Sequence, residues 1–194
     1  MTGFKEWFGH GQIYRLETTF RCPQEICDVS SRFVSKNPAQ LEKSVSSVTP
    51  PIGSAIQAFQ VGNRNELQGA VAQYLADLYQ SLVDGVVPAG RGGRVTVFIL
   101  GRYKNDRQYV PEGWHDWFGD RIELKFKTIH TSKGDEADYV ILPGLVARGF
   151  PNVKSDDPVL GLVMPEGDTY QHSEERRLFY VALTRARRSV AMFT

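Results

Sequence analysis

The chain has 194 residues, of which 41% are hydrophobic, and its 23 basic and 22 acidic side chains leave a formal net charge of +1. This length suits one domain with a substantial core, and the balanced charge leaves only a local basic patch open as a nucleic-acid signal. No apolar run approaches the roughly 18 residues of a membrane span, and a signal-peptide pattern is absent. The two cysteines, Cys22 and Cys27, provide neither a zinc pattern nor a disulfide framework. We expect a cytoplasmic globular domain without a membrane segment or a metal site.

Strand and helix patterns alternate in the first half of the chain. A short strand is predicted at Gln12–Thr18, and a helix then opens at Pro23, where the missing backbone N–H costs little. The apolar face predicted for that helix consists of Ile26, Val29, Phe33 and Val34. A further strand is expected at Ile56–Val61. The clearest amphipathic helix runs from Leu67 to Leu82 and ends at Asp84–Gly85, a good carboxyl-terminal cap.

The same alternation continues in the second half. Val95–Leu100 is almost continuously apolar, which is typical of a strand buried on both faces. Apolar residues alternate from Ile122 toward Thr128 and predict a strand with one buried face. Shorter strands are expected at Tyr139–Leu142, Leu160–Met164 and Ser189–Phe193, with a helix at Glu174–Arg187. This order favours an α/β fold with a parallel sheet, in which ligands bind at the carboxyl ends of the strands.

A polar segment with one glycine follows the predicted strand that ends at Thr128. Its chemically distinctive residues are, in order, His130, Lys133, Gly134, Glu136 and Asp138. Gly134 would allow the backbone to approach a ligand closely. Considered alone, the segment is explained equally well as an ordinary turn whose charges are solvated.

A second charged segment, Glu174–Arg188, carries its acidic residues at the start and its arginines at the end. The helix dipole favours this arrangement. Glutamate–arginine pairs also stabilise exposed helices weakly, so a solvated helix face is the alternative interpretation.

Together the two segments resemble motifs V and VI of superfamily 1 DNA helicases, in particular the UvrD/Rep/PcrA group. Leu142–Pro151 is similar to the segment that follows motif V, Leu16–Ile26 resembles motif IV, and Gly101–Tyr103 resembles motif IVa. Phe33–Gln40 resembles the helicase IV-like branch. The resemblance extends over residues 12–193, which is nearly the whole chain.

The resemblance implies a RecA-like, P-loop NTPase-type fold with a three-layer parallel sheet. The chain, residues 1–194, would form a single domain, the second helicase domain (2A), without a P-loop of its own. By the same resemblance Arg21 and Arg185 would reach the γ-phosphate of ATP held by another domain, where a planar guanidinium stabilises developing charge. Glu136 would meet the ribose hydroxyls and Gly134 would supply a close backbone approach. The alternatives are a surface arginine at position 21 and a helix-terminal cation at Arg185.

The family also implies a single-stranded DNA track along the opposite edge of the sheet. Thr128, His130 and Arg102 would line it, combining phosphate donors with stacking surfaces. A hydrogen-bonded structural histidine is the alternative for His130. The basic residues near Arg102 could attract phosphate or could simply be solvated; they are Arg91, Arg94, Arg102, Lys104 and Arg107.

Two features of such motors are absent from the sequence. It has no Gly-x-x-x-x-Gly-Lys-Ser/Thr loop, and no Asp-Glu pair follows an apolar strand. We therefore expect the chain to be the carboxyl-terminal part of a longer helicase that uses ATP with Mg²⁺. The Mg²⁺ ligands are expected on an N-terminal RecA-like domain, which would be a partner along with single-stranded DNA. The stretch between Arg102 and Thr128 is too short for a 2B insertion, and Asp135 stands where the family usually has an apolar residue.

An alternative function is a helicase-like module that binds nucleic acid or a protein partner without productive unwinding. The presence of both arginines and of Glu136 favours the motor, because a binding module has no evident need for them. An intact P-loop lysine and Asp-Glu pair in the rest of the protein would favour it further.

Overall fold

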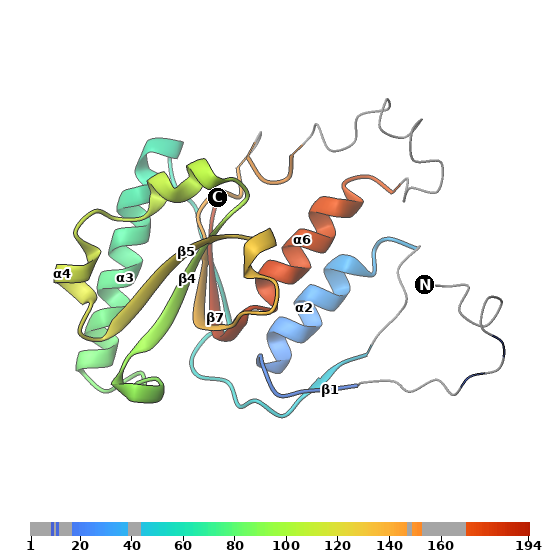
Figure 1. The fold of residues 1–194 in the computed structure, drawn as a ribbon, viewed down its shortest axis with the longest axis horizontal. Coiled ribbons are helices and arrows are strands. Elements are labelled where there is room, and N and C mark those ends of the chain that lie inside the picture. The colour runs from blue at the N-terminus through green and yellow to red at the C-terminus, as the bar shows by residue number, and fades with distance from the viewer. Residues whose placement is uncertain (1–8, 10, 12–16, 39–43, 147–148, 153–169) are drawn as a thin grey trace.

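The computed structural model describes residues 9, 11, 17–38, 44–146, 149–152 and 170–194. Within these ranges the chain forms a five-stranded sheet in the order β3-β7-β6-β4-β5, in which every neighbouring pair is parallel (Figure 1). The strands are β3 (Ile56–Phe59), β4 (Val95–Gly101), β5 (Ile122–Thr128), β6 (Ala137–Leu142) and β7 (Ala186–Phe193). A separate two-residue parallel ladder joins β1 (Thr18–Thr19) to β2 (Ser46–Ser47).

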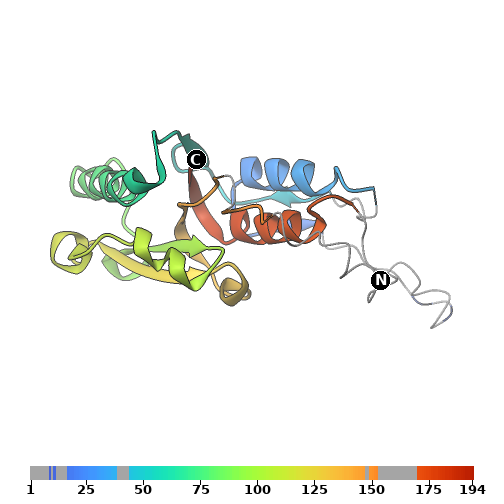
Figure 2. The same cartoon turned by 90° about the horizontal axis from the view of Figure 1, so that it is seen from above.

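Helices cover both faces of the sheet and make three layers (Figure 2). Helices α2 (Gln24–Val34) and α6 (Ser173–Leu183) lie on one face, and α3 (Leu67–Val83) and α4 (Trp114–Phe118) lie on the other. Short 3₁₀ segments connect these elements at Arg64–Glu66, Arg91–Gly93, Lys104–Tyr109 and His130–Ser132. The expected α/β fold with a three-layer parallel sheet is confirmed. No helix in the described ranges is long and apolar enough to cross a membrane.

Strand β4 shows how the sequence pattern builds the core. It pairs with β5 on one side and with β6 on the other, so it is a central strand. Successive side chains of a strand point to opposite faces. Phe98 and Leu100 accordingly pack under α2 and α6, whereas Val97 and Ile99 pack under α3. The near-continuous apolar run is therefore buried on both faces, as predicted.

The other predicted elements are mostly confirmed. Helix α3 follows the predicted span, and Gly85 after it has a φ of 71°, a conformation that glycine adopts at little cost. The buried face of α2 was predicted wrongly at Val29, which is 36% exposed. The helix is rotated so that Cys27 and Ser30 are buried alongside Ile26. The predicted strand Leu160–Met164, and residues 12–16 of the predicted first strand, lie outside the described residues.

The carboxyl-terminal boundary of the last helix was also predicted wrongly. Helix α6 ends at Leu183 rather than at Arg187, and β7 begins at Ala186. The Thr184 hydroxyl donates to the carbonyl oxygens of Tyr180 (2.9 Å) and Val181 (3.1 Å), which occupies acceptors at the helix end. Arg185 therefore lies on the turn between helix and strand instead of projecting from the helix surface.

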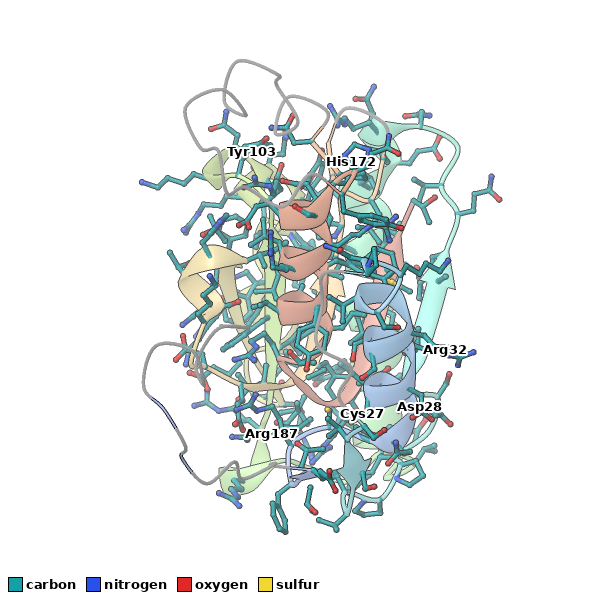
Figure 3. All side chains as sticks on the ribbon, turned by 90° about the vertical axis from the view of Figure 1, so that its right-hand side faces the viewer. Cys27, Asp28, Arg32, Tyr103, His172 and Arg187 are labelled. Atoms are coloured by element: carbon teal, nitrogen blue, oxygen red, sulfur yellow. The ribbon has the colours of Figure 1, made fainter. Side chains whose placement is uncertain are left out.

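The parallel sheet gives the molecule two chemically different ends. Glu136 and Arg185 stand immediately before β6 and β7, at the amino ends of these strands, whereas Thr128 closes β5 at its carboxyl end. Figure 3 shows this separation, with Cys27 and Arg187 toward one end and Tyr103 and His172 toward the other. The expectation that ligand residues gather at the carboxyl ends therefore fails for the predicted nucleotide residues, because their segments enter the strands rather than leave them.

Candidate functional site

Three arginines gather around Glu136 at the amino end of the sheet. Arg21 Nε lies 2.8 Å from Glu136 Oε1, and Arg187 Nε lies 2.9 Å from Oε2. Arg21 precedes α2 and Arg187 belongs to β7, so residues far apart in the sequence converge on one carboxylate. The third arginine, Arg185, lines the same cleft as Arg21 and Glu136.

The charges of this cluster keep Glu136 ionised. Burial acts to raise the pKa of Glu136, but the hydrogen bonds from Arg21 and Arg187 outweigh burial and lower it. Burial, and then the neighbouring charge of Arg21, lowers the pKa of Arg185 from its very high ordinary value. One carboxylate thus faces three guanidiniums, and the excess positive charge suits a phosphate rather than a metal cation.

Arg185 is held by the backbone around it and is only 9% exposed. Its Nε donates to the carbonyl oxygen of Val181 (3.1 Å), and its Nη1 donates to that of Asp135 (3.2 Å). It therefore binds both the end of α6 and the segment that leads into β6. All three guanidinium nitrogens thus have partners, because Nη2 also lies 3.3 Å from the Thr184 hydroxyl oxygen, to which it donates.

A cleft of about 550 Å³ opens beside these arginines. Arg21, Glu136 and Arg185 line it, together with Tyr180 and Phe20. The Phe20 ring is 80% exposed, which is unusual for a large apolar side chain and leaves one face available for stacking. The cleft thus combines cationic groups with an aromatic surface.

Gly134 is exposed and precedes Glu136 by two positions, but it does not line the cleft. Its φ is 94°, and a Cβ built there would meet no atom within 4 Å. The conformation favours glycine, and the backbone at this point is open to a ligand. Asp135, which follows it, is paired with Lys127 at 2.6 Å, and this pair explains why an acidic residue is tolerated at that position.

The predicted DNA residues lie at the carboxyl ends of β4 and β5. Thr128 is paired in register with Gly101, and Arg102 follows directly, so the structure brings these two residues to the same edge. Thr128 exchanges hydrogen bonds with Thr131, whose Oγ1 donates to the Thr128 carbonyl oxygen at 3.0 Å. His130 begins the 3₁₀ turn beside them and is exposed.

Arg102 is not a free surface cation. Its Nη2 lies 2.7 Å and its Nε 3.0 Å from Glu175 Oε1, and the Glu175 side chain is only 1% exposed. Glu175 also accepts a hydrogen bond from the backbone N–H of Asn152 at 3.1 Å. This ion pair ties the end of β4 to the start of α6 and orients the guanidinium.

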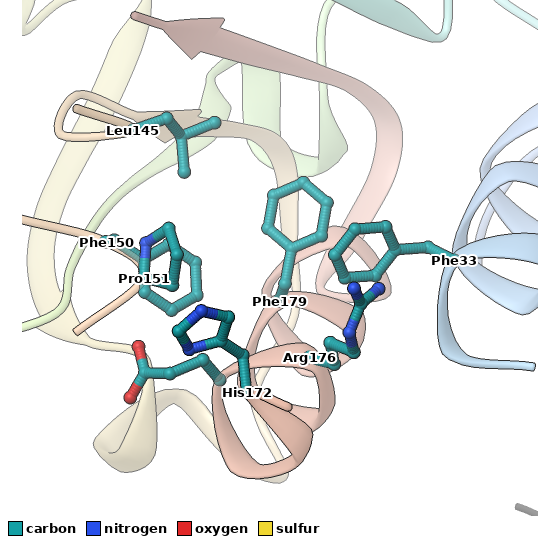
Figure 4. A pocket seen from close by; sticks show the side chains of 8 residues that line it. Phe33, Leu145, Phe150, Pro151, His172, Arg176 and Phe179 are labelled. Atoms are coloured by element: carbon teal, nitrogen blue, oxygen red, sulfur yellow. The ribbon is translucent and has the colours of Figure 1, made fainter. Parts of the chain in front are cut away.

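An apolar pocket of about 360 Å³ lies next to this ion pair (Figure 4). His172, Glu175 and Arg176 line it together with aromatic and aliphatic side chains; the apolar residues are Phe33, Leu145, Phe150, Pro151 and Phe179. The Phe33 and Phe179 rings are 4.8 Å apart and pack edge to face. This pocket belongs to the carboxyl end and is separate from the arginine cluster.

The basic residues grouped along the sequence do not form one patch. Arg91 and Arg94 precede β4, whereas Lys104 and Arg107 follow it, so the seven residues of the strand separate them. In the part of the chain that the structure describes, no three His, Cys, Asp or Glu residues are grouped to hold a metal ion.

Comparison with known proteins decides the family. Residues 115–194 match the model of the UvrD-like helicase C-terminal domain. The chain is 33% identical over 192 residues to "DNA helicase IV" of Escherichia coli (strain K12), an alignment that covers 97% of this chain. The chain contains a UvrD-like helicase C-terminal domain. The resemblance to the UvrD group is thereby confirmed.

A second relative agrees with this assignment. A 65-residue stretch, 34% of this chain, is 40% identical to a "Probable DNA helicase" of Mycoplasma pneumoniae (strain ATCC 29342 / M129 / Subtype 1). The chain spans only 25% of the length of the Escherichia coli protein and 11% of the Mycoplasma protein. The UvrD-like domain is thus similar to one part of each of these longer proteins.

The structure adds residues in and beside the UvrD-like domain's cleft that the sequence did not suggest. Arg187 was missed because the predicted helix extended through it, whereas in the structure it lies on β7 and its Nε contacts Glu136 at 2.9 Å. Phe20, Cys22 and Cys27 were missed because only the fold brings them beside Glu136. The exposed aromatic next to Arg21 was the one available signal.

Proposed function

We propose that this chain is the second motor domain of an ATP-dependent DNA helicase or translocase and that residues 1–194 act as one domain. The observation that carries the proposal is the pairing of Arg21 and Arg187 with Glu136, next to Arg185 in the cleft that Arg21, Glu136 and Arg185 line. An ATP site between two RecA-like domains needs such cations on the domain that lacks the P-loop. The relatives that are DNA helicases support the same assignment.

Within this proposal Arg21 and Arg185 stabilise the charge that develops on the γ-phosphoryl group. A guanidinium does this well because it is planar, permanently charged and carries several donors. Arg185 is already oriented by its backbone contacts, whereas Arg21 would exchange Glu136 for phosphate. Glu136 then accepts ribose hydroxyls with the oxygen that Arg21 releases, and the Gly134 backbone allows close approach. Phe20 offers its exposed ring to the base.

The cofactor would be ATP with Mg²⁺, with the P-loop and the metal ligands supplied by an N-terminal RecA-like domain. The excess of guanidiniums in this cleft fits phosphate oxygens and does not fit a cation. Mg²⁺, when bound, neutralises charge on the phosphates. This domain's own residues bind and orient the outer phosphate from the opposite side.

The carboxyl end of the sheet would contact single-stranded DNA through Thr128, His130 and Arg102. Segment 128–136 runs from this end to the arginine cluster, because β5 and β6 are parallel and the chain must return across the sheet between them. One continuous segment therefore carries both a predicted DNA residue and the predicted ribose residue. A shift of Glu136 on nucleotide binding would be transmitted to His130 along this segment.

The test is the ATP turnover of the helicase that carries this domain, with Arg21→Ala compared with Arg32→Ala. Arg32 lies in the last turn of α2, outside the cleft, and is the matched control. We expect Arg21→Ala to lower kcat by about 10³-fold or more, as loss of an arginine finger does, and Arg32→Ala to retain it. Near-normal turnover of Arg21→Ala in a folded protein would instead favour the interaction module.

A further inference from the structure

The two cysteine side chains meet inside the arginine cleft. Their Sγ atoms lie 3.5 Å apart, both are free thiols, and Cys22 and Cys27 are only 3% and 5% exposed. They are the only two cysteines in the sequence, so their proximity creates a single dithiol. A disulfide requires a sulfur separation of about 2.05 Å, which leaves about 1.5 Å of closure.

The start of α2 holds the two thiols in place. Pro23 is the N-cap of α2 and separates Cys22 from the helix that contains Cys27. The Ser47 hydroxyl donates to the Cys22 carbonyl oxygen at 2.6 Å and fixes that residue against β2. The pairing is therefore local to residues 22–27, and closure of the bond does not involve the five-stranded sheet.

We propose that Cys22 and Cys27 form a reversible oxidation site, at which hydrogen peroxide converts the dithiol into an intramolecular disulfide that draws Arg21 away from Glu136. In the first step one sulfur, as thiolate, attacks a peroxide oxygen. The O–O bond breaks, a sulfenic acid forms and water leaves. The other thiol then attacks the sulfenic sulfur, the S–O bond breaks and a second water leaves. Two thiols are oxidised, one peroxide is reduced, and both thiol protons end in water.

The environment sets the rates of the two steps. Burial, and then the adjacent Cys27 sulfur, raise the pKa of Cys22 to about 12. Because the thiolate is the nucleophile, the first step is slow at neutral pH and accelerates as the pH rises. The second step is fast because the partner sulfur is already in contact. A dithiol of this kind passes to the disulfide without accumulating the sulfenic acid.

The consequence for Arg21 follows from its position next to Cys22. Arg21 reaches Glu136 with a single hydrogen-bonded contact at 2.8 Å, so a shift of its backbone toward α2 breaks that contact. The formation of the disulfide between Cys22 and Cys27 does not depend on any catalytic role of Arg21. The effect on ATP turnover rests on the proposed function.

The first experiment treats the 194-residue chain with hydrogen peroxide and measures intact mass, thiol content after denaturation, and oligomeric state. We expect both thiols to be lost together, with a mass loss of two hydrogen atoms, in a monomer that dithiothreitol restores. In Cys22→Ser and in Cys27→Ser the remaining sulfur should gain oxygen atoms instead. Oxygen addition to the wild-type chain without disulfide formation, or disulfides between chains, would overturn the proposal.

The second experiment measures ATP turnover of the helicase before and after peroxide, each variant relative to its own untreated rate. We expect a several-fold loss of kcat in the wild type that dithiothreitol reverses, and a smaller loss in Cys27→Ser, which controls for oxidation elsewhere. If the disulfide forms and turnover is unchanged, the claim about Arg21 is wrong. Failure of the motor assignment is recognised separately, because Arg21→Ala would then retain turnover without any oxidant.

Discussion

Arg21 and Glu136 form a 2.8 Å ion pair across 115 positions of sequence. The pair joins the segment before α2 to the segment before β6, and Arg187 completes it from β7. A single carboxylate thereby orders two guanidiniums beside Arg185. Phosphate can enter only by sharing or displacing these contacts, so the charge balance around Glu136 decides how strongly the cleft attracts an anion.

Glu136→Gln should destabilise the fold at neutral pH and should lose this effect in acid. The folded-state pKa of Glu136 lies below its ordinary value of about 4.3. The ionised Glu136 carboxylate therefore stabilises the fold fully at pH values above its ordinary pKa. This stabilisation is lost as the pH falls through the lower pKa of the folded state. Thermal melts of both proteins from pH 7 to pH 3 should converge. Glu112→Gln, at an exposed glutamate outside the cleft, is the control. A constant gap between the two melting temperatures at every pH would contradict the account.

The isolated chain should bind ATP weakly and should not hydrolyse it. The cleft offers cations and an aromatic ring, but the P-loop that cradles the phosphates is not in this sequence. Calorimetric titration with Mg²⁺ and ATP measures this directly. A micromolar dissociation constant for the chain alone would show that the cleft is a complete nucleotide site.

Much of this architecture could be predicted from the sequence because it is encoded locally. The apolar run of β4 and the amphipathic spacing of α3 each identify one element without reference to the rest of the chain. The boundary of α6 could not be predicted in this way, since the arginine-rich segment suits a helix, and the Thr184 hydroxyl bonds that accompany its end are seen only in the fold. That one boundary determined whether Arg187 could be predicted as a partner of Glu136.

The ion-pair partner of Arg102 could not be predicted from the sequence either. Glu175 lies 73 positions away, and its charged surroundings in the sequence predict an exposed glutamate on a helix. In the structure its side chain is buried. Tertiary placement of α6 over the sheet made the pair, and no local pattern encodes that placement. By contrast, Arg21, Glu136 and Arg185 were selected through the helicase motifs, and the structure brings all three to one cleft.

Glu175→Gln should destabilise the domain by about 3 kcal/mol, because it leaves Arg102 without a counter-charge in a largely buried position. Chemical denaturation measures this loss. Glu123→Gln provides the matched control, since its ion pair with Lys125 is exposed and contributes about 0–1 kcal/mol. Equal, small effects of the two variants would mean that the buried pair does not organise the carboxyl end.

His130→Ala should weaken single-stranded DNA binding by the helicase and leave the melting temperature nearly unchanged, because the ring is exposed. Binding to this domain alone should be weak and should fall steeply with salt, since few phosphates are contacted. Fluorescence anisotropy with a labelled oligonucleotide at several salt concentrations measures both properties. Basal ATP hydrolysis without DNA should survive the substitution. An unfolded variant would instead show that His130 is structural.

Arg185 gives the most direct test of the central claim that this domain completes an ATP site. The measurement is steady-state ATP hydrolysis by the helicase carrying Arg185→Ala or Arg185→Lys, at a temperature where melts show both to be folded. The account predicts a loss of kcat on the order of 10³-fold or more with little change in ATP affinity, and no rescue by lysine, which lacks the planar fork. Arg32→Ala removes another helix-terminal arginine and is the control. It should lower stability by about 0.3–1 kcal/mol and leave ATP turnover unchanged. A destabilised Arg185→Ala protein with near-normal kcat would contradict the account.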